Sequence, residues 1–378
     1  MLNKLPKKEL LLSFASLVVA LVIAEVGLRG YAWSIASRRW IVEYSRSWDE
    51  IPNEFLRYAT HPYFSHVPNP EFRSEDGRDR HNSFGFRGKE IEADKPEGVC
   101  RIFCIGGSTT YTTSVDNHVD SYPAQLERVL REKYGHRDVE VINTGVAAFS
   151  SLDSLLNLQL RVLPLDPDLI VVYHGINDVA ARLVPPGKYR RDNSGYRVDW
   201  SIQDRDSPHR WWHHSRLAYC VGVRMGVIPM RRVGYGFLPN TMLMSIEDLK
   251  RNPPAYFETN LRQMALLAHD SGAKIMFSTW AHFGDFNDPI LEAGVLENNF
   301  VVRRAGELLD VPVFDFANQM PMDQEYWYDT IHVNERGAVR KAELFAAFID
   351  DNFLANAAFS GLSEQPSVGV DTAQNRQN

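Results

Sequence analysis

Two short segments of this chain carry side chains that together could cleave an ester. Ser108 follows Gly106 and Gly107, and glycines allow a tight turn with close approach by a substrate. Asp329 lies three residues before His332, so its carboxylate can hold the imidazole in the tautomer that accepts a proton. A serine alcohol is a poor nucleophile unless such a base removes its proton. The pattern therefore predicts Ser108 as nucleophile, with His332 as base and Asp329 behind it.

An ester cleaved in this way passes through a tetrahedral oxyanion, which needs hydrogen-bond donors. We expect three donors: the backbone N–H of Ser108, the unobstructed N–H of Gly145 and the side-chain amide of Asn177. Two histidines close to these segments, His174 and His282, are candidates to line the substrate, and simple packing is the alternative for His174. The oxyanion hole is thus expected to combine two backbone donors with one neutral side chain.

The elements that must position these residues alternate between apolar strands and amphipathic helices. Predicted strands are 100–105, 139–143, 169–173, 274–279 and 311–314. Predicted helices are 122–134, 151–163, 253–269, 292–309 and 335–353. This alternation predicts an α/β fold, with a five-stranded parallel sheet covered by helices on both faces. Sites in such sheets form at the carboxyl ends of the strands, where the candidate residues fall.

The motifs Gly-Gly-Ser, Asn-x-Gly, Gly-x-Asn-Asp and Asp-x-x-His occur here in that order, which resembles the SGNH/GDSL hydrolase superfamily. The resemblance covers about Val99 to Phe353 and implies a three-layer α/β/α sandwich, with the triad and oxyanion roles given above. Gly107 stands where the family's name motif has Asp, so the local packing must differ. Residues 82–88 (NSFGFRG) resemble a segment of bacterial membrane-anchored members, and no chemistry is assigned to them.

The N-terminus contains an apolar run from Leu10 to Val26, preceded by Lys4, Lys7 and Lys8. At ~1.5 Å per residue the run spans ~26 Å, slightly less than a ~30 Å hydrocarbon core. We favour an uncleaved membrane anchor, with the catalytic part outside the cytoplasm, in the periplasm. A cleaved signal peptide and a buried soluble helix are the alternatives.

These patterns divide the chain into successive parts. We predict a cytoplasmic N-terminus at 1–9, a transmembrane anchor at 10–28, a juxtamembrane segment at 29–96, a hydrolase domain at 97–355 with an insertion at 180–252, and a disordered tail at 356–378. The insertion carries Trp200, Trp211 and Trp212 among several arginines. This composition leaves open a lid over the sheet, a sugar-binding surface or a contact with lipid headgroups.

Composition excludes several other classes of protein. The net charge is −7 over 378 residues without a long basic run, so nucleic acid is not expected as a partner. The chain has three cysteines, and Cys100 and Cys104 on one strand would lie ~13 Å apart, too far for a disulfide. Neither a phosphate-binding glycine loop with lysine nor a zinc-protease helix motif is present, so we expect no cofactor and no metal.

The sequence therefore favours a serine esterase that removes a short acyl group, acetyl in the first instance, from an ester, with a carbohydrate as the candidate substrate. The choice of this substrate rests on analogy with the family. An O-acyltransferase acting on envelope glycans with the same triad, and a noncatalytic glycan-binding envelope protein, are the alternatives. The oligomeric state is left open.

Overall fold

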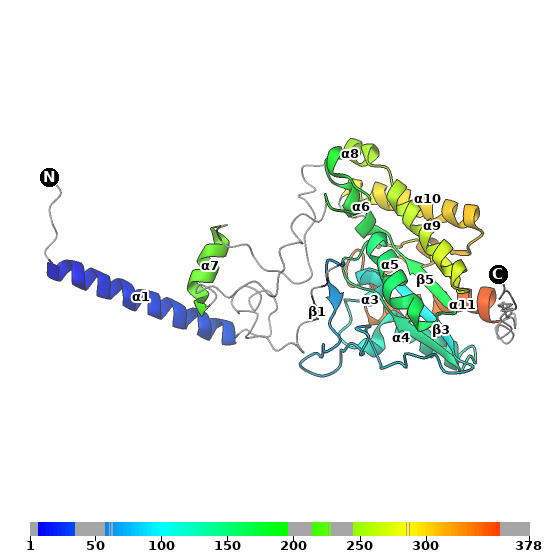
Figure 1. Cartoon of the computed structure of the whole chain (residues 1–378), viewed down its shortest axis with the longest axis horizontal. Coiled ribbons are helices and arrows are strands. Elements are labelled where there is room, and N and C mark those ends of the chain that lie inside the picture. The colour runs from blue at the N-terminus through cyan, green and yellow to red at the C-terminus, as the bar shows by residue number, and fades with distance from the viewer. Residues whose placement is uncertain are drawn as a thin grey trace, which may run out of the picture.

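The computed structural model describes residues 7–34, 57–59, 61, 63–195, 214–225, 227, 245–284, 286 and 288–355. The predicted tail at 356–378 lies outside these residues, as do the tryptophans of the insertion and most of the first half of the juxtamembrane segment. Figure 1 shows helix α1 projecting away from an α/β body that carries the candidate site residues.

The centre of the body is a five-stranded sheet in the order β4-β3-β5-β6-β7, and every neighbouring pair of its strands is parallel. Its strands are β3 Cys100–Gly106, β4 Val139–Asn143, β5 Leu169–Tyr173, β6 Lys274–Ser278 and β7 Val313–Phe314. The predicted α/β fold with a five-stranded parallel sheet is confirmed, and β4 and β5 have the predicted bounds. Strand β7 begins later than predicted, since Pro312 has no N–H to donate to a ladder.

Helices cover both faces of the sheet, as expected. They are α4 Tyr122–Glu132, α5 Ser151–Asn157, α9 Ala255–Asp270, α10 Pro289–Leu309 and α11 Glu335–Ile349. Successive side chains of a strand point to opposite faces. In β3, Ile102 and Cys104 therefore pack with α4 and α11, whereas Phe103 and Ile105 pack with α5 and α9. Cys100, Cys104 and Cys220 are all free thiols.

Two short helices at the carboxyl ends of strands bear candidate residues. Helix α3, Ser108–Tyr111, follows β3 directly, and α6, Ile176–Arg182, follows β5. Neither is among the helices predicted above, and α6 extends into the segment that we assigned to the insertion. Asn252 closes the insertion, because its amide donates to the carbonyls of Arg182 and Val184 at 2.6 and 2.7 Å.

The described part of the juxtamembrane segment packs against the body. Strand β1, Tyr58–Ala59, pairs antiparallel with β2, Val67–Pro68. Tyr58, Phe64 and Val67 share a buried cluster with Phe149 from the loop after β4. This segment is therefore part of the structure around the site.

The apolar N-terminal run forms α1, Lys7–Ser34, which is longer than the predicted anchor at 10–28. Its 24-residue stretch Lys8–Tyr31 is long and apolar enough to cross a membrane, criteria that a signal sequence also meets. Helix α7, Arg216–Arg224, belongs to the insertion and packs against α1 (Figure 1).

Candidate active site

Ser108 is presented by a sharp turn at the carboxyl end of β3. A Cβ on Gly106 would lie 2.1 Å from Thr110 Oγ1 and 2.5 Å from the carbonyl oxygen of Tyr173, so only glycine fits there. Gly107 is the N-cap of α3 and keeps an extended backbone with a φ of −87°. The chain can therefore leave the sheet and enter a helical turn within two residues. Ser108 is half-buried between neighbours that are buried.

Asp329 and His332 belong to one tight loop immediately before α11. The Oδ1 atom of Asp329 accepts hydrogen bonds from the N–H groups of Ile331 at 2.8 Å and of His332 at 2.7 Å. The Oδ2 atom of Asp329 lies 2.9 Å from Nδ1 of His332. Asn334 then caps α11 by accepting from the N–H of Gly337 at 3.0 Å. One carboxylate thus shapes the loop and also orients the imidazole.

The two segments meet at the hydroxyl of Ser108. Nε2 of His332 lies 2.9 Å from Oγ of Ser108, within hydrogen-bond reach. The hydroxyl of Ser114 donates to the carbonyl of Val333, which ties the chain after α3 to the histidine loop. With Nδ1–H directed at Asp329, the free Nε2 of His332 can accept the proton of Ser108.

Asp329 is suited to remain ionised beside His332. Burial opposes its charge, but hydrogen bonds from His332 and from the N–H of Ile331 outweigh that effect and hold the pKa of Asp329 below its ordinary value. Its side chain is 44% exposed, so the effect on stability is screened by solvent.

Asn177, at the start of α6, lies directly against Gly107. Its Nδ2 donates to the carbonyl of Phe149 at 2.8 Å. A Cβ on Gly107 would come within 2.6 Å of that nitrogen. Gly107, which stands where the family's name motif has Asp, therefore lies directly against the amide of Asn177 and leaves no room there for a Cβ unless the amide moves.

Gly145 does not offer the free donor that the sequence predicts. Its N–H donates to Oδ1 of Asn143 at 3.1 Å, and the residue is buried. Ala148 is half-buried and has a φ of +63°. Within the described part of the chain, no acceptor is found for its N–H. Because this conformation is uncommon for alanine, the sequence carried no signal for it.

The two histidines expected to line the substrate lie in different surroundings. His174 is 4% exposed, and its Nε2 lies 2.8 Å from Oγ of Ser154. Burial lowers the pKa of His174 to about 4, which keeps the ring neutral. His282 is half-buried, its Nδ1 lies 2.9 Å from the carbonyl oxygen of Gly284, and its ring centroid is 4.5 Å from that of Phe286. His282 is thus the more accessible of the two.

Comparison with known proteins identifies the family. The chain belongs to the GDSL-like lipase/acylhydrolase family, whose sequence model matches residues 104–340. Solved structures with a similar fold include a lipase/acylhydrolase from Enterococcus faecalis, at 19% identity and a TM-score of 0.42, covering 67% of this chain and 96% of that one. Another is an acetyl xylan esterase from Geobacillus stearothermophilus, at 15% identity and a TM-score of 0.40, covering 66% and 93%. No curated protein was found to match.

Membership places the chain in a family of ester-hydrolysing enzymes. The matched residues include Ser108 and Asn177 and extend past His332. The hydroxyl of Ser108, the amide of Asn177 and the imidazole of His332 therefore all lie within the part of the chain that the family model matches.

Proposed function

We propose that this chain is a serine esterase that works through an acyl-enzyme, with Ser108, His332 and Asp329 as its catalytic triad. The contact between Nε2 of His332 and Oγ of Ser108 at 2.9 Å carries the proposal. Oγ of Ser108 attacks the ester carbonyl while its proton passes to Nε2 of His332. The tetrahedral intermediate collapses as that proton goes to the departing alcohol, leaving an acyl-serine. Water, deprotonated by His332, then releases the carboxylic acid.

The oxyanion of each tetrahedral intermediate is assigned to donors next to Ser108. We assign the N–H of Ser108, the amide of Asn177 and the N–H of Ala148, which takes the role first expected of Gly145. Support comes from the carbonyl of Phe149, which binds Nδ2 of Asn177 at 2.8 Å and thus brings Ala148 into the same neighbourhood. Donors fixed before the reaction stabilise the developing charge without reorganisation.

The substrate proposed for this site is an ester of a short acyl group, acetyl first, with a polar alcohol such as a sugar. Three half-buried residues assigned to the chemistry at Ser108, namely Ala148, Asn177 and His332, are small or polar. Such surroundings suit a short acyl group and a hydrogen-bonding alcohol better than a long apolar chain.

A series of p-nitrophenyl esters tests both the reaction and the acyl length. We expect the full chain in detergent to hydrolyse the acetate, with kcat/KM falling for the octanoate and longer esters. An oligosaccharide acceptor added to the acetate reaction distinguishes transfer from hydrolysis, because transfer yields acetylated sugar at the expense of free acetate. Absence of hydrolysis and of transfer with every ester would refute the proposal.

We further propose that α1 is retained as a membrane anchor, with the catalytic body on the extracytoplasmic side. Glu25 of α1 accepts hydrogen bonds from the N–H groups of Arg216 and Leu217 at 3.1 and 2.9 Å, where α7 begins. Arg29 donates to the carbonyl of His214 at 2.7 Å. Helix α7 of the insertion would lose these hydrogen bonds if α1 were cleaved off as a signal peptide, which favours a retained α1. We expect the protein in the membrane fraction to keep its intact N-terminus. We also expect protease added outside the cytoplasm to cleave its C-terminus.

A further inference from the structure

The turn that carries Ser108 is too short to be stable alone. Helix α3 has four residues, and one helical turn does not offset the cost of ordering it. The carbonyl of Ser108 is satisfied by the N–H groups of Thr112 and Thr113, at 2.7 and 3.2 Å. The carbonyls of Thr109, Tyr111 and Thr112 bind side chains from elsewhere in the chain. The position of Ser108 therefore depends on those side chains.

Arg87 supplies the first of these contacts. Its Nη1 donates to the carbonyls of Tyr111 at 2.8 Å and Thr112 at 2.7 Å, and its Nη2 donates to that of Val115 at 2.8 Å. The guanidinium side chain is fully buried, with its carbon 4.7 Å from the centroid of the Tyr111 ring. A cation at the carboxyl end of a helical turn also stabilises the dipole of that turn.

The segment at 82–88, which had no chemistry assigned to it from its sequence, holds Arg87 in place. Nε of Arg87 donates to Oδ1 of Asp79 at 2.7 Å, and both side chains are buried. The N–H of Arg87 donates to the carbonyl of Asn143 at the end of β4, at 3.2 Å. Gly85 has a φ of +78°, and a Cβ there would lie 2.6 Å from the carbonyl oxygen of Pro68. The segment thus folds tightly and sets the guanidinium against the turn.

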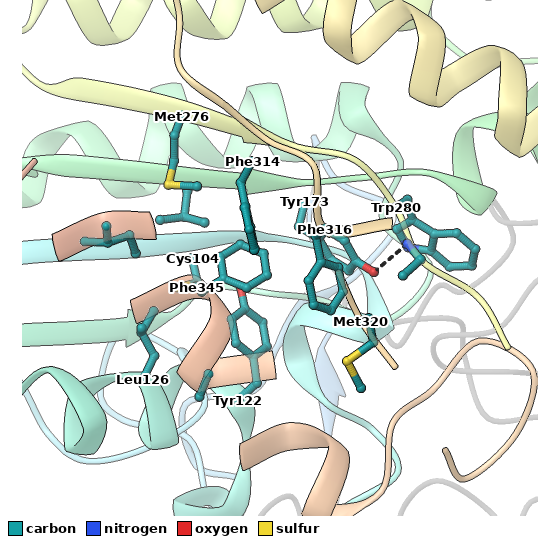
Figure 2. Packing of buried hydrophobic residues seen from close by; sticks show 14 of the residues in the cluster. Cys104, Tyr122, Leu126, Tyr173, Met276, Trp280, Phe314, Phe316, Met320 and Phe345 are labelled. Atoms are coloured by element: carbon teal, nitrogen blue, oxygen red, sulfur yellow. Dashed lines mark hydrogen bonds between the residues drawn. The ribbon is translucent and has the colours of Figure 1, made fainter. Parts of the chain in front are cut away.

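Lys341 of α11 supplies the second contact. Its Nζ donates to the carbonyl of Thr109 at 3.2 Å, and the residue is 1% exposed. The same nitrogen lies 3.7 Å from the ring centroid of Tyr173 and 4.0 Å from that of Tyr122. Figure 2 shows these two rings converging with Phe316 and Phe345 in one buried cluster. Burial lowers the pKa of Lys341 well below its ordinary value, but the neutral amine can still donate to Thr109.

We propose that Arg87 and Lys341 are positioning residues, which hold the carbonyls of the Ser108 turn and keep its hydroxyl in reach of His332. The inference rests on the proposed function of Ser108. The order of the residues along the chain supports it as well, because α11 begins three residues after His332 and carries Lys341. One helix therefore fixes both the base and the turn that bears the nucleophile. A displacement of about 1 Å in such a pair can lower the rate about 100-fold.

Three variants of the full chain in detergent test this inference. Arg87→Lys removes the guanidinium fork, which a lysine cannot reproduce. Lys341→Met keeps the volume but removes the donor to Thr109. Arg101→Lys is the matched control, because Arg101 is a buried arginine that binds Glu140 at 2.8 Å and the carbonyl of Leu165 at 2.9 Å, at the opposite end of β3.

With p-nitrophenyl acetate, at temperatures where all variants are folded, we expect kcat to fall about 100-fold for Arg87→Lys and about 10-fold or more for Lys341→Met. KM should change less than about 3-fold, and the rate of fluorophosphonate labelling of Ser108 should fall with kcat. Arg101→Lys should keep kcat within about 2-fold even if its melting temperature drops. If Arg87→Lys does not fold, Asp79→Asn leaves the guanidinium present but loosely held and should lower kcat about 5-fold.

Hydrogen exchange gives a readout that does not depend on catalysis. Amides in peptides covering residues 106–115 should exchange faster in Arg87→Lys and Lys341→Met than in Arg101→Lys. If the wild type itself is neither active nor labelled, the proposed function fails, and exchange alone decides whether the side chains of Arg87 and Lys341 hold the turn. Equal exchange and equal kcat in all three variants would refute the inference.

Discussion

Gly107 is the position at which one added carbon should disable the site without unfolding it. The Cβ of Gly107→Ala would lie 2.6 Å from Nδ2 of Asn177, and ordinary contacts begin near 3.4 Å. The amide must therefore retreat by roughly 0.8 Å, which disturbs its 2.8 Å bond to the carbonyl of Phe149. The φ of −87° at Gly107 lies outside the left-handed region, and the next atom that the new Cβ would meet, the carbonyl oxygen of Phe149, is 3.3 Å away, so a small local shift should let the fold tolerate the change.

The expected loss is set by the oxyanion hole. Complete removal of one donor costs about 10²–10³ in kcat, so a displaced Asn177 should cost about 10–100-fold. KM should change little, because the amide acts on charge that develops only in the transition state. Initial rates with p-nitrophenyl acetate over a range of concentrations measure both constants. The melting temperature of the variant serves as the control for folding.

A double-mutant cycle identifies the cause of that loss. If Gly107→Ala acts only by moving the amide, then adding it to Asn177→Ala should lower kcat no further. The reasoning is refuted if the two losses multiply, or if Gly107→Ala is as active as the wild type.

Three further outcomes follow from the same structure. Because hydrogen bonds hold the pKa of Asp329 below its ordinary value, its carboxylate should stay charged until the pH falls below the usual range of an aspartate, so Asp329 should add no step to log(kcat/KM) against pH above that range; a step there that Asp329→Asn abolishes would contradict this. Ala148→Gly should raise the free energy of unfolding by about 1 kcal/mol in a denaturant titration and keep kcat, since its φ of +63° strains alanine, whereas Ala147→Gly should not stabilise. Glu25→Ala should speed amide exchange in residues 215–224 about 5-fold, the effect of losing a cap worth about 1 kcal/mol, and Glu9→Ala should leave that exchange unchanged.

The sheet could be predicted from the sequence because its signals are local. Runs such as Leu169–Tyr173 are entirely apolar and buried on both faces, so their bounds follow directly from composition. The pairing of Ser108 with His332 also followed, because both lie after strands whose carboxyl ends meet at one edge. The strand predicted at 100–105 matches β3 except for Gly106, the last residue of β3.

The contacts that position the site could not be predicted in the same way. Lys341 is a single charged residue in an amphipathic helix, and nothing local indicates that aromatic rings enclose it. Arg87 reaches residues more than 20 positions away, and Glu25 reaches residues about 190 positions away. Such interactions depend on the assembled fold. The hydrogen bond from the N–H of Gly145 to Asn143 was not foreseen for a related reason, because the absence of a side chain does not show which N–H remains free.

Covalent labelling shows whether Ser108 is an activated nucleophile, on which the proposed reaction depends. The full chain and its Ser108→Ala variant, both folded in detergent, would be treated with a fluorophosphonate, and their intact masses compared. We expect one adduct on the wild type, mapped to Ser108, and none on the variant. Equal labelling of both proteins, or no labelling of a folded wild type, would contradict it.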